Sequence, residues 1–261
     1  MRRALALEYD GRAYCGFQSQ PSGQSVQDSL ERALEAIAAA KIRVIAAGRT
    51  DAGVHATSQI VHFDADVERP ANAWVRGVNA HLPPSAAVLW CVNVSPEFHA
   101  RFGATARHYA YLLQNRAERP GLWSGRVGWH HATLDDEAMR DAARSLLGSH
   151  DFSSFRAAEC QARTPFRTLR RLDVTRVGAM VRFDFCADAF LHHMIRNIVG
   201  ALVEVGSGKR PPSWVANLLD AADRTRGATT FAPDGLYFTG ADYDARFALP
   251  PTRRDVATML S

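Results

Sequence analysis

The strongest constraint on the fold is an order of hydrophobic periodicities that occurs twice along the 261-residue chain. In each half, a run of alternating apolar and polar residues comes before a run with apolar residues at helical spacing, and further alternating runs follow. Alternation with a period of two is typical of half-buried strands, whereas spacings of three and four are typical of amphipathic helices. The order predicts an α+β fold of two similar α/β halves, each a mostly antiparallel sheet backed by helices.

The first half is predicted to contain four strands and two helices. Ser25 is expected to cap the first helix, because Asp28 lies at the third helical position and apolar residues follow at helical spacing. The strands are expected over residues 3–9, 42–47, 59–63 and 87–94, and the second helix over residues 71–79.

The second half repeats this order with longer helices. Gly148 is expected to end a helix over residues 135–147, and Val177-Gly178-Ala179 has the composition of a hairpin turn. The other helices are expected over residues 190–205 and 212–222, and the strands over 106–114, 169–176, 180–185 and 236–241. The predicted division is an N-terminal half (1–104), a C-terminal half (105–248) and a tail (249–261).

Composition excludes several classes of protein. Apolar residues make up 47% of the chain and charged residues 22%, which excludes a disordered or collagen-like chain. The four cysteines have no CxxC spacing, so neither a zinc ribbon nor a disulfide framework is expected, and a reducing compartment fits best. The longest stretch without Asp, Glu, Lys or Arg, 77–96, contains two adjacent prolines, and the N-terminus lacks the apolar run of a signal peptide. We therefore expect a soluble, cytoplasmic protein that does not associate with membranes.

Positive charge is concentrated in particular segments. The net charge is +4, and residues 156–182 carry seven arginines against Glu159 and Asp173. Codon bias in a GC-rich genome would explain the excess of arginine over lysine, but it does not explain the clustering. Because the guanidinium group binds phosphate through two parallel hydrogen bonds, the clustering favours an anionic partner.

One loop combines residues suited to catalysis. Gly48-Arg49-Thr50-Asp51-Ala52-Gly53-Val54-His55 lies between two predicted strands. Glycines allow tight turns and the close approach of a ligand backbone, and an arginine near an aspartate favours the ionised carboxylate. Such a carboxylate in a dry pocket can act as a nucleophile or a base. The alternative is an ordinary turn with a surface Arg–Asp pair, which contributes little to stability.

The segment AGRTDAGVHA, residues 47–56, resembles the active-site segment of the tRNA pseudouridine synthase A family. Six further segments resemble blocks of the same family in the same order: EYDG (8–11), FHARFGATARHYAY (98–111), DFSSFR (151–156), CQARTPFR (160–167), FLHHMIRNIVG (190–200) and GLYF (235–238). The resemblance implies the pseudouridine synthase fold and a homodimer. It also implies an enzyme, an isomerase that converts uridine to pseudouridine at positions 38, 39 and 40 in the anticodon arm of tRNA.

The reaction breaks the bond between nitrogen 1 of uracil and the sugar and joins carbon 5 to the sugar instead. Because nothing is oxidised or hydrolysed, neither a cofactor nor a metal is required. The resemblance places the catalytic carboxylate on Asp51 and assigns Tyr109 to stacking on uracil, with a further role as the base that removes the carbon 5 proton. It also assigns Arg196 as the basic residue that pairs with the aspartate, and Arg49 to phosphate contact beside it.

Other residues are candidates for binding the RNA substrate. They are basic or can carry positive charge, and they lie in or near the family-like segments: His55, Arg107, Arg163, Arg167 and Arg170. The adjacent histidines 192 and 193 do not indicate a metal site, because neighbouring side chains on a helix point apart and no HExxH motif is present.

Two other functions fit parts of the sequence. One is an RNA-binding module with a decayed site, against which the intact Asp51, Tyr109 and Arg196 argue. The other is a hydrolase that pairs Asp51 with Asp64 or Asp66, for which no supporting motif is present. Base isomerisation of a tRNA transcript without chain cleavage would distinguish the three.

Overall fold

The computed structural model describes residues 1–259, and these residues form two compact units. Unit 1 contains Met1–Arg107 together with the residues from Tyr237 onward, and unit 2 is His108–Leu236. The division predicted from the sequence placed residues 237–248 in the second half. They group with unit 1 because β10 (Leu236–Asp242) pairs with β3 (His55–Asp64), so that Tyr237 lies opposite His55.

The sheet of unit 1 is built around β1 (Arg2–Tyr9), which pairs antiparallel with β3 on one side and with β4 (Ala86–Asn93) on the other. The short strand β2 (Ile45–Ala46) also pairs antiparallel with β3, whereas β10 pairs parallel with it. The strand order in this unit is β4-β1-β3-β10.

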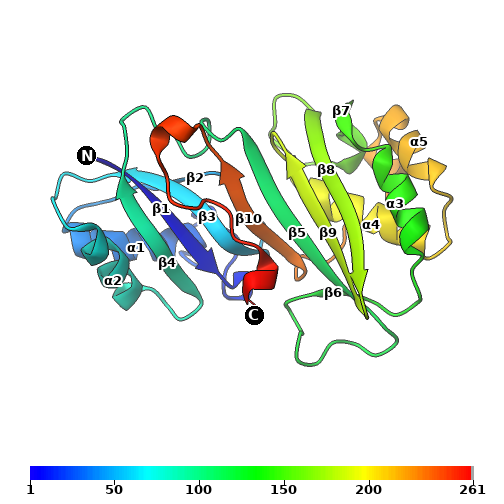
Figure 1. Ribbon diagram of the computed structural model, residues 1–261, viewed down its shortest axis with the longest axis horizontal. Helices are drawn as coiled ribbons and strands as arrows, with labels where there is room; N and C mark the ends of the chain where they lie inside the picture. Colours follow the sequence, from blue (N-terminus) through cyan, green and yellow to red (C-terminus); the bar gives the residue numbers. More distant parts are fainter. Residues whose placement is uncertain (260–261) are drawn as a thin grey trace. The chain divides into compact units, whose positions relative to one another are not determined.

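Two helices, α1 (Val26–Ala38) and α2 (Ala71–His81), back this sheet (Figure 1). The predicted cap of α1 is confirmed: the Ser25 hydroxyl accepts from the Asp28 backbone N–H at 3.0 Å, and the Asp28 carboxylate accepts from the Ser25 N–H at 3.2 Å. This reciprocal capping box satisfies N–H groups that the first turn leaves without a helical partner.

The opposite face of the sheet is covered by the segment that follows β10, drawn in red in Figure 1. Its backbone carbonyls accept hydrogen bonds from side chains on the sheet: Ser58 donates to Thr252 at 3.0 Å, and Trp90 donates to Pro251 at 3.1 Å. With helices on one face and this segment on the other, β3 is buried from His55 to Phe63. Residues 260–261 of the predicted tail lie outside the described residues.

In unit 2 the strand order is β5-β9-β8-β7, and a short β6 pairs parallel with β5. The predicted hairpin is confirmed: Val177 pairs with Met180 across a two-residue turn, in which Gly178 has a φ of +57°. The strands are β5 (Ala106–Asn115), β6 (Gly128–His130), β7 (Gly148–Asp151), β8 (Phe166–Val177) and β9 (Met180–Ala187), and the helices are α3 (Asp136–Arg144), α4 (Met194–Gly206) and α5 (Ser213–Ala221).

Both units therefore confirm the predicted α+β fold, because each has mostly antiparallel strands backed by helices. Short 3-10 helices complete the connections, at Gly11–Ala13, Ser153–Phe155, Arg224–Arg226, Ala245–Phe247 and Val256–Met259. Within residues 1–259, no helix combines the length and the apolar character needed to span a bilayer.

Four predicted boundaries were wrong. Strand β3 begins at His55 rather than at residue 59. The strand over residues 42–47 is reduced to β2, because the Val44 N–H donates to the Glu31 carboxylate at 3.0 Å instead of to a neighbouring strand. Helix α3 ends at Arg144, and Gly148 begins β7. Helix α4 begins at Met194 rather than at residue 190, because the His192 carbonyl accepts from the Ala157 N–H and His193 has a left-handed φ of +61°.

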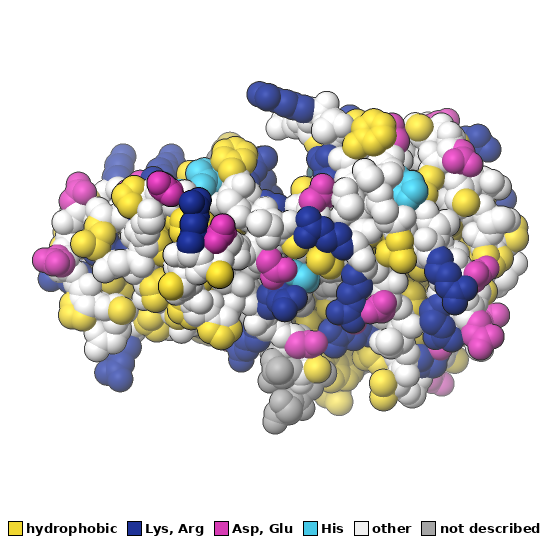
Figure 2. Space-filling view, turned by 45° about the horizontal axis from the view of Figure 1, so that its top comes forward, with side chains coloured by type: hydrophobic (Ala, Val, Ile, Leu, Met, Phe, Trp, Pro, Cys, Tyr) yellow, Lys and Arg dark blue, Asp and Glu magenta, His cyan; other side chains and the backbone are white. Residues whose placement is uncertain are grey.

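The basic segment 156–182 carries less free charge than the sequence indicates. Arg171 pairs with Asp173, Arg176 pairs with Asp136 at 2.7 Å, and Arg182 pairs with Asp184 at 2.7 Å. Figure 2 shows the same mixture on a larger scale: over its right-hand part, Lys and Arg side chains alternate with Asp and Glu side chains. The remaining arginines of the segment are the better candidates for an anionic partner.

Candidate active site

Two glycines, Gly11 and Gly16, pack closely against the backbone of the loop that carries Asp51. A Cβ atom on Gly11 would lie 2.1 Å from the Val54 carbonyl oxygen, and one on Gly16 would lie 3.0 Å from the Thr50 carbonyl oxygen. Gly16 also has a φ of +93°, which side-chain-bearing residues rarely adopt. The segment after β1 therefore approaches the loop backbone more closely than residues with side chains would allow.

A buried hydrogen-bond network holds the same loop from the interior of unit 1. The Tyr9 and Thr50 hydroxyls lie 2.8 Å apart, and the Gln59 amide donates to the Gly48 carbonyl at 2.8 Å. The Phe17 N–H donates to the Thr50 carbonyl at 3.0 Å. Burial raises the pKa of Tyr9 to about 12, so its hydroxyl keeps its proton at neutral pH. The residues on either side of Arg49 are thus fixed by groups of β1 and β3.

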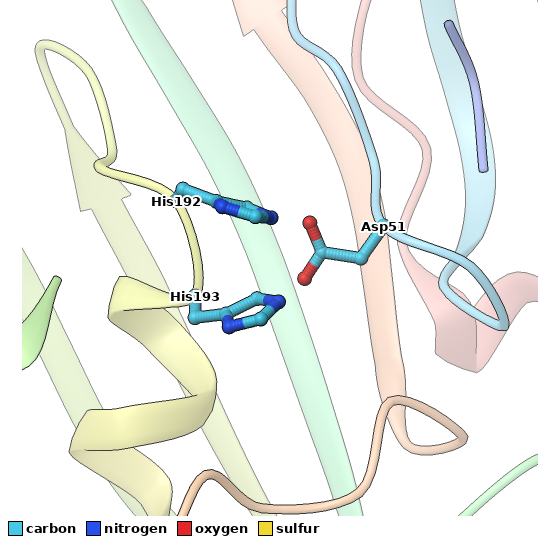
Figure 3. Close-up of side chains that lie close together, drawn as sticks. All are labelled: Asp51, His192 and His193. Atoms are coloured by element: carbon cyan, nitrogen blue, oxygen red, sulfur yellow. The ribbon is translucent and has the colours of Figure 1, made fainter. Parts of the chain in front are cut away.

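Asp51 is half-buried on this loop, just before β3 (Figure 3). Its carbonyl accepts from the Val54 N–H at 3.2 Å, which closes a turn through Gly53, whose φ is +80°. Arg49 is exposed, and within residues 1–259 its guanidinium makes no hydrogen bond or ion pair. Its head is therefore available to a ligand.

His55 belongs to the interior of β3 rather than to the exposed part of the loop. It is 3% exposed, its Nδ1 accepts from the Gly11 N–H at 3.1 Å, and its ring stacks on Tyr237 with centroids 4.7 Å apart. These contacts support a role in holding the loop. Its contact with the substrate stays a prediction.

Arg107 is bound to the backbone beside the same loop. Its guanidinium donates to the Ala47 carbonyl at 3.2 and 3.3 Å, to the Ala104 carbonyl at 3.0 Å and to the Arg101 carbonyl. One side chain thereby joins the start of the Asp51 loop to the turn around residues 99–104. Its predicted phosphate contact is untested, and these bonds support a positioning role.

The aspartates of the hydrolase alternative are remote from Asp51 along the strand. Asp51 precedes β3, whereas Asp64 is its last residue and Asp66 follows it. A ten-residue strand extends about 30 Å. The Asp64 carboxylate, moreover, accepts from Nε and one terminal nitrogen of the Arg2 guanidinium at 3.0 and 2.8 Å. A pair of catalytic carboxylates is therefore not supported.

In unit 2, Tyr109 and Tyr111 lie on the same face of β5, as the strand alternation predicts. Tyr111 belongs to the core, where its hydroxyl donates to the Ala232 carbonyl at 2.8 Å. Tyr109 is 8% exposed and packs edge-to-face on Phe190, with ring centroids 5.1 Å apart. That packing fixes the plane of the Tyr109 ring, as a stacking platform requires.

Arg196 lies in the first turn of α4 and is half-buried. Its Nε donates to the Phe231 carbonyl at 2.8 Å, and the Phe231 N–H donates back to the Arg196 carbonyl at 3.2 Å. The next residue, Asn197, is 2% exposed; it donates to the Phe155 carbonyl at 2.7 Å and accepts from the Thr230 hydroxyl at 2.7 Å. The first turn of α4 is therefore fastened to two loops of unit 2.

His192 and His193 precede α4 in a turn, and their side chains are drawn in Figure 3. Their ring centroids are 4.0 Å apart, so the expectation that the two side chains point apart was wrong. The reason is the left-handed backbone of His193, which takes both residues out of the helix. The orientation of the two histidines therefore no longer supports the predicted absence of a metal, which stays a prediction.

Among the predicted RNA-binding arginines of unit 2, Arg163 and Arg170 are exposed and Arg167 is half-buried. Arg167 donates to the Thr164 carbonyl at 3.0 Å and to the Phe166 carbonyl, and desolvation by burial lowers its pKa. Within residues 1–259, neither Arg163 nor Arg170 has an ion pair.

The functional residues that sequence reasoning missed are the ones that hold the site. Thr50, Gln59 and Asn197 are buried and polar: Thr50 and Asn197 bond to segments far away in the sequence, and Gln59 bonds back to Gly48 at the start of the loop. Gln59 and Asn197 are polar side chains in otherwise apolar elements, and Thr50 belongs to the loop itself, but none of these signals identifies the partner.

Comparison with known proteins identifies the family of the chain. A family model described as tRNA pseudouridine synthase matches residues 5–103, which contain Asp51, and residues 142–244, which contain Arg196; Arg107 and Tyr109 lie between the two matched segments. The chain belongs to the tRNA pseudouridine synthase A family.

Its relatives of that name match over nearly full length. The protein of Chromobacterium violaceum is 58% identical over 251 residues, which covers 96% of each chain. That of Nitrosomonas eutropha is 57% identical over 250 residues, covering 96% of this chain and 90% of the relative, and that of Dechloromonas aromatica is 55% identical over 255 residues, covering 98% and 97%. Among solved structures, one described as a Cbf5-Nop10-Gar1 complex aligns with a TM-score of 0.40 and 12% identity, over 96% of this chain and 50% of that chain.

Proposed function

We propose that this protein isomerises uridine to pseudouridine at positions 38, 39 and 40 in the anticodon arm of tRNA. The observation that carries the proposal is the Asp51 loop, which has the family's sequence and is held rigidly by Gly11, Gly16, Thr50 and Gln59. Rigid placement is what a reacting carboxylate needs, because small displacements of a catalytic group cost large factors in rate.

Asp51 is the catalytic carboxylate of this proposal. The target base must leave its stack before the enzyme can reach the sugar. The carboxylate then attacks or stabilises the sugar carbon, or removes a proton beside it, while the bond to nitrogen 1 breaks. Uracil turns in place and carbon 5 bonds to the sugar, while any bond between the carboxylate and the sugar breaks or any proton taken from the sugar is returned. The proton on carbon 5 leaves, and nitrogen 1 takes up a proton. The atoms balance without a cofactor, an oxidant or water.

Tyr109 and Arg196 are the partners in this chemistry. Tyr109 has a ring fixed against Phe190 and stacks on uracil, and its hydroxyl is the candidate base for the carbon 5 proton. Arg196 supplies positive charge that keeps the reacting carboxylate ionised. Arg49, Arg163, Arg167 and Arg170 bind phosphate. The enzyme acts as a cytoplasmic homodimer, for which the resemblance to the family is the support.

The deciding experiment incubates the wild-type protein with a tRNA transcript that has uridine at positions 38–40. Pseudouridine is detected by base-specific chemistry and the chain length by gel. Pseudouridine at these positions in uncleaved RNA is the expected result. Binding without conversion would indicate an RNA-binding module, and cleavage would indicate a hydrolase; either outcome overturns the proposal.

The role of Tyr109 has its own test. Phenylalanine can stack but cannot accept a proton, so Tyr109→Phe should stall the reaction after the glycosidic bond breaks. An enzyme–RNA adduct in a denaturing gel would report that stalled state. Normal turnover by this variant would reduce Tyr109 to a stacking platform.

A further inference from the structure

A ladder of three aromatic rings runs from the interior of unit 1 to its surface. Its inner ring, His62 on β3, is 3% exposed and lies 4.7 Å from the ring of His99, measured between centroids. The His99 ring lies 4.5 Å from that of Phe102, at an interplanar angle of 31°. Phe102 is 78% exposed, so the ladder ends in a phenyl ring at the surface, beside the Arg101 guanidinium.

The turn that presents Phe102 is rigid. The Nδ1 atom of His99 accepts from the N–H groups of Arg101 and Phe102, at 3.2 and 3.1 Å. The Gly103 N–H donates to the His99 carbonyl at 2.8 Å, and a Cβ atom on Gly103 would lie only 2.8 Å from that oxygen. The backbone of Phe102 is therefore fixed before any ligand arrives, which lowers the entropic cost of binding through its ring.

The inner end of the ladder is equally fixed. Nδ1 of His62 accepts from the Ala100 N–H at 3.1 Å. Both imidazoles accept at Nδ1, so Nδ1 carries no proton and both rings are uncharged. Burial lowers the pKa of His62 to about 4, and desolvation together with Arg2 and Arg101 lowers the pKa of His99. The ladder therefore stays intact at neutral pH.

Charge beside the ladder indicates what kind of ligand it takes. The Arg101 guanidinium carbon lies 5.5 Å from the centroid of the Phe102 ring. An exposed aromatic ring next to a cation suits a nucleotide, which offers a flat base and a negative phosphate together, better than it suits an apolar protein surface. A single exposed phenylalanine is common on protein surfaces; the two imidazole rings packed at an angle beneath it are not explained by exposure alone.

The ladder is joined to the Asp51 loop by a single side chain. The Arg107 guanidinium donates both to the Arg101 carbonyl and to the Ala47 carbonyl, where the loop begins. A ligand stacked on Phe102 therefore lies on a turn that Arg107 connects by hydrogen bonds to the proposed catalytic loop.

We propose that Phe102 is a stacking platform for an unpaired nucleobase of the tRNA substrate, with Arg101 contacting the phosphate of the same nucleotide. This inference rests on the proposed function, because it takes its ligand to be the RNA on which Asp51 acts. An unpaired base is the expected ligand because its face is free, whereas bases inside a helix already stack on their neighbours.

The test compares Phe102→Leu, which keeps an apolar side chain without a ring, with Phe102→Trp, which keeps the ring. For Phe102→Leu, we expect KM and the Kd for tRNA to rise about tenfold, as the loss of one base-stacking contact predicts. Its kcat and its melting temperature should equal those of the wild type. Phe102→Trp should bind like the wild type, and its added fluorescence, over that of the five native tryptophans, should be quenched by saturating tRNA.

The control is Leu122→Ala, which trims a side chain that is 98% exposed in unit 2 and should change none of these quantities. Unchanged KM and Kd in Phe102→Leu would overturn the platform, as would tryptophan fluorescence at position 102 that tRNA does not alter. A melting temperature that falls together with binding would assign Phe102 a structural role and would also overturn it. Failure of the proposed function is distinguishable, because it would appear as wild-type protein that forms no pseudouridine.

Discussion

The Asp51 loop of unit 1 and the basic start of β8 in unit 2 are built in opposite ways. The loop backbone is held by Gly11, by Gly16 and by a buried hydroxyl pair, and its residues have little room to move. On β8, Arg170 extends into solvent without an ion pair among the described residues, and Arg167 bonds only to carbonyls of its own connection.

The difference matches the two tasks that an RNA-modifying enzyme combines. Bond rearrangement at one carbon requires groups placed to within about 0.5 Å. Phosphate binding needs charge at roughly the right place, which long flexible side chains provide. Substitutions in the loop should therefore lower turnover, whereas substitutions on β8 should weaken RNA binding and leave turnover at saturation unchanged.

The largest effect is expected from Asp51→Asn, which keeps the shape of the side chain and removes its charge. Isomerisation should fall about a thousandfold or more, while the Kd for tRNA stays within a factor of about two. Single-turnover assays and filter binding measure the two quantities separately. A variant that keeps a tenth of the activity would remove Asp51 from the mechanism.

Gly11→Ala tests whether the hold on the loop matters as much as its chemistry. The added methyl group would lie 2.1 Å from the Val54 carbonyl oxygen, so the loop backbone must shift. We expect kcat to fall about a hundredfold, with a smaller change in tRNA affinity. Gly121→Ala is the matched control, because no atom lies within 4 Å of its new methyl group. Equal kcat values for the two variants would show that the loop tolerates displacement.

The third expected effect is on β8. Replacing Arg167 and Arg170 together by Ala should weaken the binding of every substrate tRNA to a similar extent. The slope of log affinity against log salt should become shallower by about one for each lost phosphate contact. The kcat at saturating tRNA should not change. A salt slope equal to that of the wild type would show that these arginines are ordinary surface residues.

The smallest effect concerns the interior of unit 1 and is thermodynamic. The pKa of His62 is about 4 in the folded protein and about 6.5 in the unfolded chain, so the unfolded state binds the extra proton between these values. The contribution of His62 to the free energy of unfolding should therefore be largely present above pH 6.5. The free energy of unfolding should fall by about 1 kcal/mol when the pH is lowered from 7.5 to 5.5.

His62→Asn supplies the control for that measurement, because its side-chain oxygen can still accept from the Ala100 N–H but does not titrate. Denaturant unfolding at several pH values should show a weaker pH dependence in this variant than in the wild type. Parallel pH profiles would show that His62 does not contribute.

Local patterns allowed much of the fold to be predicted. The capping box at Ser25 and the turn at Gly178 depend on neighbouring residues, and both were correct. The start of α4 was not, because the apolar pattern continues through Phe190, which is half-buried against Tyr109, and Leu191, which is buried, and neither has helical backbone. Periodicity reports burial, and the backbone of this segment is decided by its bond to Ala157.

The candidate site was predicted less evenly. The Asp51 loop could be recognised because its residues are contiguous. The count of arginines in residues 156–182 overestimated the free charge, because Asp136 neutralises Arg176 from a different element. The burial of His55 was missed because β3 begins four residues earlier than its alternation indicates. Contacts between distant segments are what a single sequence does not contain.

Because β10 pairs with β3, the two units are completed at different stages of synthesis. Unit 2 is one continuous stretch of chain, so all of its strands and helices are present once Leu236 has left the ribosome. Unit 1 is completed later. Strand β3 is synthesised early, but its parallel neighbour β10 and the segment that covers the outer face of the sheet are synthesised after unit 2. Because domains fold as units as they emerge from the ribosome, the later half of the chain is expected to mature first. The strand that follows the Asp51 loop gains its last partners only when synthesis of the unit is nearly finished.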